Sequence, residues 1–579
     1  MLEFIQLLIQ RYQVVTASLN KNDHRCLLFQ QRIEQLFLMD AFIRKGLLIE
    51  SSPATPIQIA ILGPTQTGKS TLTNLILNNQ SAGVSPLAGY TVHPQGFCHQ
   101  TGLKQCLGLQ GFFGRFQQLK QSELKSDRYD CYSLTESLQN SALLPDCVFW
   151  DTPDFDSIDS ADYKEGVIRT IALADIVVLV VSKEKYADMS VWEMMSMLES
   201  FHQPTLICLN KLLEGNEQVI VESLKDKWMQ ARGDDFPPVI PLYYQKQTGI
   251  PDWPASANQQ FFQLAKKVSL KKHADYETSL LNKHWHSWLE PIVLEHETVK
   301  VWQALVDQNI EQIIQEYQRD FLEHPYYYDT FQNALIELLN LLEIPGISRI
   351  LTKTRRVLTW PLRKLMGIGR KSVLADSQEE VLLNQLGDHL LILLADQLLE
   401  KIDGDPKQNK WWNDCYCLLR QQRNEILDSY QIAVENYSNY FQQDVDATAN
   451  KLYNKLDEHP FILNSLRATR ISTDAAAMAL VIATGGIGIH DLVITPAMLS
   501  VTSLLTESAL GGVMNSAKAE LKKQQMDTVK SDLFISSLQQ SLYLLPEQLS
   551  EKGRFNISPE QVQKAESQRK EKKHGIRLF

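Results

Sequence analysis

The sequence predicts an α/β domain, built on a mostly parallel and doubly wound sheet, followed by a large all-α helical part. Two observations predict this fold class. Up to about residue 260, short apolar runs rich in β-branched residues alternate with helical stretches. Beyond that point, apolar positions recur mainly at helical spacing. A chain of 579 residues is long enough for several domains.

The first predicted strand, at 57–62, leads into a glycine-bounded loop that ends in Gly-Lys-Ser, and a helix starts there. Glycines let successive backbone N–H groups point inward at an anion, and the helix N-terminus adds its dipole. In this spacing the lysine reaches the outer phosphates and the serine hydroxyl suits Mg²⁺. We therefore predict a nucleotide-binding P-loop. Its residues are Gly63, Pro64, Thr65, Gln66, Thr67, Gly68, Lys69, Ser70 and Thr71.

Further apolar runs predict the rest of the sheet. A strand ends on Asp151, a β-branched run follows at 174–182, and another strand at 204–211 ends in Asn210 and Lys211. A last short strand is expected at 239–244, and helices are expected at 163–173 and 188–201. Ligands bind at the carboxyl ends of parallel strands, where these polar residues fall. An aspartate such as Asp151 can hold Mg²⁺ through water, across from Ser70.

Taken in order, these motifs resemble the GTPase series, and the chain resembles bacterial dynamin-like and Era-like P-loop GTPases of the TRAFAC class. The resemblance implies GTP and Mg²⁺ as ligands. It implies catalytic roles for Lys69, Thr65, Gln66 and Thr91, with Thr101 as a second candidate for the switch threonine. It also implies a base pocket braced by Asn210 and Lys211, and a metal site at Ser70, Thr91 and Asp151.

Two positions depart from the family pattern. Asp154 stands where the glycine that senses the γ-phosphate usually stands, and a carboxylate beside a phosphate is unfavourable unless it points away. After Asn210 and Lys211, Leu213 replaces the aspartate that reads guanine. Guanine specificity and active hydrolysis are therefore left open by the motifs.

The spacing of the motifs favours the dynamin-like subfamily, because 82 residues separate Lys69 from Asp151. Helices are expected at 277–323, 376–402 and 409–457, and their length suggests a stalk. The expected divisions are N-terminal helices packing with the stalk at 1–52, a GTPase domain at 53–260, stalk helices at 261–343, a basic amphipathic tip at 344–375, stalk helices at 376–473, an apolar helical hairpin at 474–514, and a C-terminal helix with a basic tail at 515–579.

The basic segment 344–375 contains eight basic residues and no acidic one. Such a segment suits an anionic membrane surface; docking on acidic helices of this chain is the alternative, and contact with RNA is a third interpretation. The candidates for membrane contact are Arg349, Lys353, Arg355, Arg356, Trp360, Arg363 and Lys364. A second candidate, 475–506, is either a shallow membrane hairpin or a pair of buried helices, since each uncharged arm is too short to span a bilayer.

Composition restricts the partners and the compartment. The net charge of −11 argues against a nucleic-acid partner for the chain as a whole. The scattered cysteines suit a reducing cytosol, and the first residues show no secretion signal. We therefore expect a cytoplasmic protein, peripheral at an inner membrane.

The function predicted from the sequence is that of a dynamin-like protein that binds and hydrolyses GTP at a membrane surface. Its expected partners are a guanine nucleotide, an anionic membrane surface, and a second copy of the chain that pairs through the GTPase domain. Two alternatives stay open. One is a soluble nucleotide-binding scaffold with weak or no hydrolysis, and the other is an Era-like GTPase associated with ribosomes or RNA.

Overall fold

The structure is a computed structural model, and it forms two compact units. The sheet unit comprises Met1–Leu294 with Ser550–Phe579, and the helical unit comprises Glu295–Leu549. The predicted fold class, a mostly parallel doubly wound sheet plus an all-α part, is confirmed. The residues that the structure describes are 1–20, 23–78, 92–125, 127–137, 139–154, 160–201, 203–212, 217–245, 251–323, 378–404, 408–458, 511–549 and 553–575. Thr91, Leu213, the basic segment 344–375 and the apolar segment 475–506 lie outside these residues.

The described part of the sheet unit holds one eight-stranded sheet in the order β3-β4-β2-β5-β1-β6-β7-β8. Neighbouring strands pair in parallel, except that β2 runs antiparallel to β5. The strands are β1 (Ile57–Leu62), β2 (Gln95–His99), β3 (Gln117–Leu119), β4 (Cys131–Glu136), β5 (Cys147–Asp151), β6 (Ile176–Ser182), β7 (Thr205–Leu212) and β8 (Val239–Tyr243).

The sequence predicts β1, β5, β6, β7 and β8 but not β2, β3 and β4. The three missed strands are short and carry Gln, Gly, His, Ser or Thr, so no apolar run or strict alternation marks them. They form the edge of the sheet beyond β5 and occupy part of the long step between Lys69 and Asp151.

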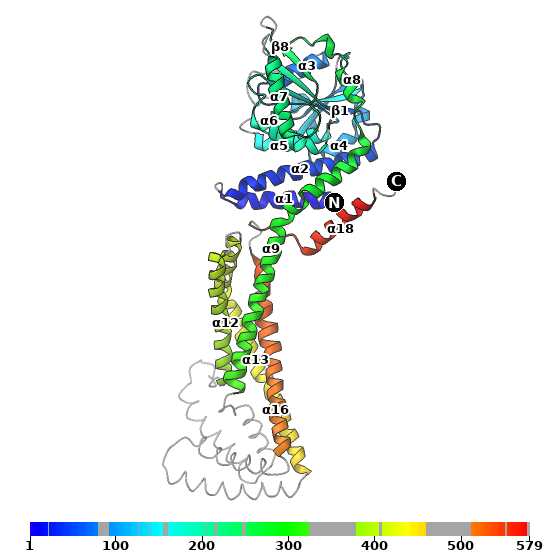
Figure 1. The fold of residues 1–579 in the computed structure, drawn as a ribbon. Coiled ribbons are helices and arrows are strands. Elements are labelled where there is room, and N and C mark those ends of the chain that lie inside the picture. The colour runs from blue at the N-terminus through cyan, green and yellow to red at the C-terminus, as the bar shows by residue number, and fades with distance from the viewer. Residues whose placement is uncertain are drawn as a thin grey trace, which may run out of the picture. The chain divides into compact units, whose positions relative to one another are not determined.

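Alternate residues of each central strand point to opposite faces of the sheet. In β1, Ala60 and Leu62 pack into one hydrophobic core, and Ile59 and Ile61 pack into another. Helices therefore cover both faces (Figure 1). The main helices of this unit are α1 (Leu2–Ser18), α2 (His24–Ser51), α3 (Lys69–Leu77), α4 (Gly108–Phe113), α5 (Ser160–Leu173), α6 (Met189–Leu198), α7 (Glu217–Ala231), α8 (Gln260–Ala265) and α18 (Pro559–Gly575).

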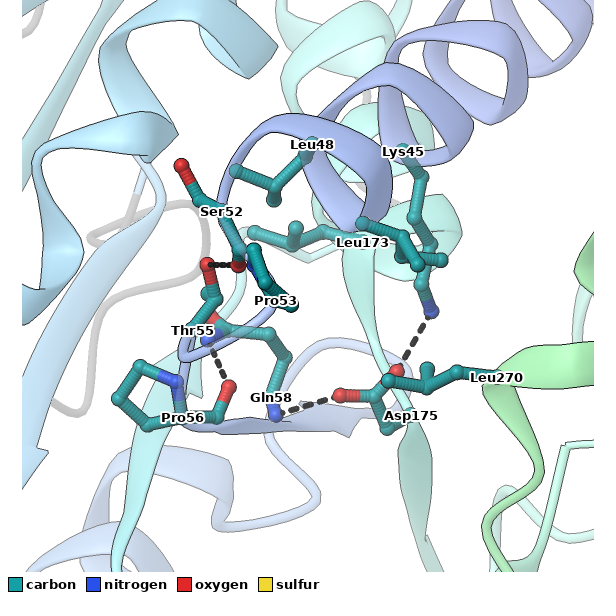
Figure 2. Close-up of a pocket in the computed structure, with 11 residues that line it drawn as sticks. Lys45, Leu48, Ser52, Pro53, Thr55, Pro56, Gln58, Leu173, Asp175 and Leu270 are labelled. Atoms are coloured by element: carbon teal, nitrogen blue, oxygen red, sulfur yellow. Dashed lines mark hydrogen bonds and ion pairs between the residues drawn. The ribbon is translucent and has the colours of Figure 1, made fainter.

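Buried ion pairs attach α2 to the sheet and to α5. Lys45 of α2 lies 2.8 Å from the carboxylate of Asp175, which also accepts the backbone N–H of Gln58 at the start of β1 (Figure 2). These residues line a cavity of about 30 Å³, which has room for little more than water. On α5, Arg169 pairs with Asp40 at 2.7 Å and with Glu165 at 2.9 Å. All these contacts lie away from the P-loop and hold the helix in place.

The helical unit is built from long helices that share one hydrophobic core. Its helices are the part of α9 (His273–Tyr317) from Glu295 onward, α12 (Gln378–Gly404), α13 (Asn409–Asp457), α16 (Gly511–Thr528), a π-helical stretch at Val529–Gln539, and α17 (Gln540–Leu544). These bounds agree with the helices predicted at 376–402 and 409–457. Among the helices that the structure describes, none combines the length and the apolar run that crossing a bilayer requires.

One carboxyl group links four helices of this unit. Glu379 Oε1 accepts hydrogen bonds from the hydroxyls of Tyr317 and Tyr437, at 2.7 and 2.8 Å, and from the Gln525 amide at 2.9 Å. Burial raises the pKa of Glu379, and the hydrogen bonds from Tyr317, Gln525 and Tyr437 oppose that rise. Sequence periodicity predicts the helices but not this polar contact between them.

Candidate functional site

The loop between β1 and α3 has the backbone that a phosphate cradle needs. Gly68 adopts φ +92° as it caps α3, and a Cβ there would lie 2.6 Å from the Asn210 amide nitrogen. A Cβ on Gly63 would overlap the Val180 carbonyl oxygen of β6. Only glycine fits both positions, so the two glycines let the loop curl tightly against β6 and β7.

The Lys69 ammonium lies inside this loop. It donates to the carbonyl oxygens of Gly63, at 2.8 Å, and Pro64, at 3.2 Å, and it forms an ion pair with the carboxylate of Asp154. Only 5% of the lysine side chain is exposed, and 13% of the aspartate. The sequence leads us to expect that a carboxylate at position 154 is unfavourable here unless it points away. Instead, Asp154 turns toward the lysine and neutralises it.

Ser70 and Asp151 meet beside the loop. The Ser70 hydroxyl donates to Asp151 Oδ2 at 2.8 Å, and Asp151 is buried at the end of β5. The other oxygen, Oδ1, accepts no hydrogen bond from the described residues. Burial raises the pKa of Asp151 to about 6, although the Ser70 hydrogen bond and the nearby Lys69 oppose the shift. A buried carboxylate with an open oxygen, next to a hydroxyl, is a donor set that fits Mg²⁺.

Asn210 and Lys211 brace the loop from β7. The Asn210 amide donates to the Thr67 carbonyl oxygen at 2.8 Å, and the Lys211 ammonium donates to the Gln66 carbonyl oxygen at 2.7 Å. Asn210 Oδ1 in turn accepts the Lys211 backbone N–H at 2.8 Å. The sequence predicts a strand that ends in these two residues, and β7 runs through them to Leu212. Their side chains therefore extend from β7 and stabilise the conformation of the P-loop through these hydrogen bonds.

The remaining predicted residues of the loop differ in exposure. Pro64 and Thr67 are buried, and the Thr67 hydroxyl donates to the Pro64 carbonyl oxygen at 2.8 Å. Gln66 is exposed at the tip with φ +64°, and Thr65 beside it is half-buried, as is Thr71 in the first turn of α3. The structure thus gathers residues 63–71, Asp151, Asn210 and Lys211 at one edge of the sheet, with Thr91 outside the described residues. Thr101, the second candidate for the switch threonine, follows β2, and because β2 runs antiparallel to β5 it lies at the opposite end of the strands and is not part of this site.

Sequence reasoning missed the partner of Lys69. The signal was present in the Asp-x-x-Asp spacing from Asp151 to Asp154, which places a second carboxylate three residues after the metal-site aspartate. A sequence alone does not show which way that side chain turns. From the sequence alone, Asp154 is only a departure from the family motif, whereas the structure shows that it is the counter-ion of Lys69.

Part of the sheet unit is similar to a known family. Residues 58–211 match a family model described as 50S ribosome-binding GTPase. No curated protein matches the chain. Two solved chains, both reported for an oligomerised bacterial dynamin pair that senses and tethers membranes over long range, are similar to it. One has 12% identity and a TM-score of 0.30 and covers 91% of this chain and 92% of its own. The other has 11% identity and a TM-score of 0.33, with 94% and 92% covered.

TM-scores this low do not establish a shared overall arrangement, so the family match rests on the sheet unit alone. The matched span begins in β1 and ends at Lys211, and it therefore contains the P-loop, Asp151 and the bracing pair. The motifs, the mostly parallel sheet and the family model agree. This chain contains a P-loop GTPase domain at residues 58–211, joined to a large helical part.

Proposed function

We propose that this chain binds GTP with Mg²⁺ and hydrolyses it, as a dynamin-like GTPase that acts at an anionic membrane surface. The observation that carries the nucleotide part is the P-loop. Its glycines are sterically required, its lysine is held inside it, and Ser70 and Asp151 meet at its rim. These groups supply the cradle, the cation and the metal ligands that transfer of a phosphoryl group needs.

Each described residue has a distinct role in this proposal. Backbone N–H groups of the P-loop bind the inner phosphates, and Lys69 neutralises the outer ones. Ser70 and Asp151 would hold Mg²⁺, which would neutralise the charge that develops on the phosphates. Thr65 and Gln66, at the tip of the loop, are the candidates for orienting the attacking water together with Thr91.

The dynamin-like part of the proposal is supported by the organisation of the chain. Helices from both ends, α1, α2 and α18, belong to the sheet unit, and helices of up to 49 residues form a separate unit. Dynamin-like proteins combine such flanking helices with a stalk. The basic segment 344–375 is the proposed membrane contact, and pairing of two GTPase domains is the proposed trigger of hydrolysis.

A second function has one specific observation in its favour. Because Asp154 neutralises Lys69, the chain could serve as a nucleotide-binding scaffold with weak or no hydrolysis. The matched family is also described by ribosome binding, which keeps association with ribosomal particles as an outcome to be tested.

The test of the nucleotide proposal is binding and turnover of GTP and ATP by the purified full chain, wild type against Lys69→Ala. We expect tighter binding of GTP than of ATP, and loss of turnover by at least about 100-fold in the variant. Lys104→Ala is the matched control, because Lys104 is exposed on the same unit and contacts none of the site residues described above. Equal affinity for GTP and ATP would overturn the guanine assignment. Tight binding without turnover would favour the scaffold.

The membrane proposal has a separate test. Flotation with vesicles of phosphatidylglycerol and phosphatidylethanolamine should carry the chain upward, and vesicles of neutral lipid should not. A variant with Arg349, Lys353, Arg355, Arg356, Arg363 and Lys364 replaced by serine should lose flotation and keep nucleotide turnover. Flotation that persists in this variant would reject the basic segment as the contact. Sedimentation with ribosomal particles instead of vesicles would favour the Era-like alternative.

A further inference from the structure

The environment of Lys69 suggests how the site distinguishes nucleotides by the number of their phosphates. In a P-loop this lysine reaches the two outer phosphates of the nucleotide. Here its ammonium is already bound to two loop carbonyl oxygens and to the carboxylate of Asp154. A terminal phosphate must therefore compete with an anion that belongs to the chain itself.

The position of Asp154 makes that competition direct. The residue follows β5 by three positions, at the same end of the sheet as the P-loop. Its side chain is nearly buried, so water screens its charge only weakly. Asp151 ends β5 three residues earlier and lies beside the same loop, where it accepts a hydrogen bond from Ser70. Another anion brought to Lys69 would meet two carboxylates there.

The inner phosphate meets a different surface. The P-loop binds it through backbone N–H groups and the N-terminus of α3, whose shape is set by Gly63, Gly68 and the braces from Asn210 and Lys211. None of these groups needs Asp154 to move. A carboxylate on Lys69 thus opposes the last phosphate of a triphosphate more strongly than the phosphates of a diphosphate.

We propose that Asp154 determines phosphate-length specificity, because its carboxylate takes the place of a terminal phosphate on Lys69 and makes the site prefer a nucleoside diphosphate to a triphosphate. This inference rests on the proposed function, since it concerns the same site. Asp154 is therefore a specificity-determining residue. Before nucleotide binds, its carboxylate already occupies the position on Lys69 that a terminal phosphate would take.

The test is calorimetric titration of the full chain, in the presence of Mg²⁺, with GDP and with a GTP analogue whose β,γ-bridge is an imido group. Wild type should bind GDP at least about 10-fold more tightly than the analogue. Asp154→Asn keeps the size of the side chain and removes its charge. It should tighten binding of the analogue by about 10- to 100-fold, which corresponds to about 1.4–2.8 kcal/mol, and leave GDP within about 3-fold.

Two further variants separate charge from other effects. Asp154→Glu keeps the charge and should keep the preference for GDP, whereas Asp154→Gly should behave like the asparagine variant. Asp146→Asn removes one charge from an exposed residue just before the other end of β5, and it should change neither affinity. Circular dichroism of each variant checks that it is folded. The ratio of the wild-type affinities for GDP and for the GTP analogue tests the inference without any variant.

Some outcomes of these titrations would overturn the inference alone, and one would overturn the proposed function as well. A wild type that prefers the triphosphate overturns the inference, as does an asparagine variant that changes both affinities equally. Weaker binding of the analogue to the asparagine variant would also overturn it, and would assign Asp154 to the metal instead. If the wild type and both Asp154→Asn and Asp154→Gly bind neither nucleotide, the proposed function fails as well.

Discussion

Buried charge has different partners in the two units of this molecule. In the sheet unit, buried cations face carboxylates: Lys69 faces Asp154, and Lys45 faces Asp175. In the helical unit, the carboxyl of Glu379 is met by two hydroxyls and an amide, all of them neutral. A buried cation such as Lys69 can release its carboxylate and bind the phosphate of a ligand instead. A carboxyl that is surrounded by neutral donors offers no cation for such a ligand to bind.

This difference suggests which contacts are functional and which are structural. Of the ion pairs in the sheet unit, the one at Lys69 lies inside a phosphate cradle, and the pairs at Lys45 and Arg169 hold α2 against the sheet and α5. The network around Glu379 joins α9, α12, α13 and α16. Three substitutions test this division, and we give them in order of expected effect.

The largest effect is expected from Arg169→Ala. Arg169 is buried between Asp40 and Glu165, so its removal leaves two buried carboxylates short of a partner. Breaking such a pair costs about 3–5 kcal/mol, and the remaining contacts of Arg44 and Arg115 place this case near the lower value. Denaturant unfolding of the sheet unit, identified as the transition that Mg²⁺ and GDP shift, measures the loss.

Lys164→Ala is the control for that experiment. Lys164 lies on the same helix and pairs with Glu34, but both side chains are roughly one-third exposed. An exposed pair of this kind contributes at most about 1 kcal/mol. If the two variants lose similar stability, the α2–α5 pairs are no more structural than a surface ion pair, and the division proposed above is wrong.

A smaller effect is expected from Gly63→Ala. The added methyl group would overlap the carbonyl oxygen of Val180, a backbone atom that cannot turn aside, so the loop must shift. We expect a loss of about 1–3 kcal/mol in the same unfolding transition, together with weaker binding of nucleotide. In Gly111→Ala, within α4, the methyl group meets no atom within 4 Å and should stabilise the helix slightly. Equal behaviour of the two variants would mean that the P-loop is not held tightly against β6.

The smallest effect is expected from Glu379→Gln, and it depends on pH. Since burial raises the pKa of Glu379, the folded chain keeps this proton to a higher pH than the unfolded chain. Wild type therefore loses stability as pH rises from about 4.5 toward 7, whereas the glutamine variant does not. Hydrogen exchange of α12 across this range measures the difference, with Glu400→Gln, exposed on the same helix, as control. A variant that is destabilised most at pH 7 would show that the charge itself holds the helices together.

The sequence predicts the P-loop, Asp151, Asn210 and Lys211 well because their chemistry is local. Each follows or ends an apolar run, and the carboxyl ends of parallel strands meet at one edge of the sheet. The long helices are predicted equally well, because apolar residues at helical spacing over tens of residues are typical of a helix and of little else.

Contacts between distant segments could not be predicted in this way. Lys69 and Asp154 are 85 residues apart, and Glu379 meets Gln525 across 146. Nothing in the spacing of such residues reveals the rotamers that bring them together. Strands β2 and β4 were missed for a related reason: their burial comes from neighbouring strands rather than from their own composition. Strand β3 is three residues long and mostly exposed, so its sequence carries no apolar signal.

Hydrogen–deuterium exchange of the full chain, with and without Mg²⁺ and GDP, tests the central claim most directly. If the sheet unit binds the phosphates of a guanine nucleotide on its P-loop, exchange should slow at 63–71 and 205–212 in the wild type. It should slow much less in Gly63→Ala, whose added methyl group would displace the loop from β6, and α12 should not respond in either protein. Protection that is absent from 63–71 in the wild type, or that is unchanged by Gly63→Ala, would contradict the account.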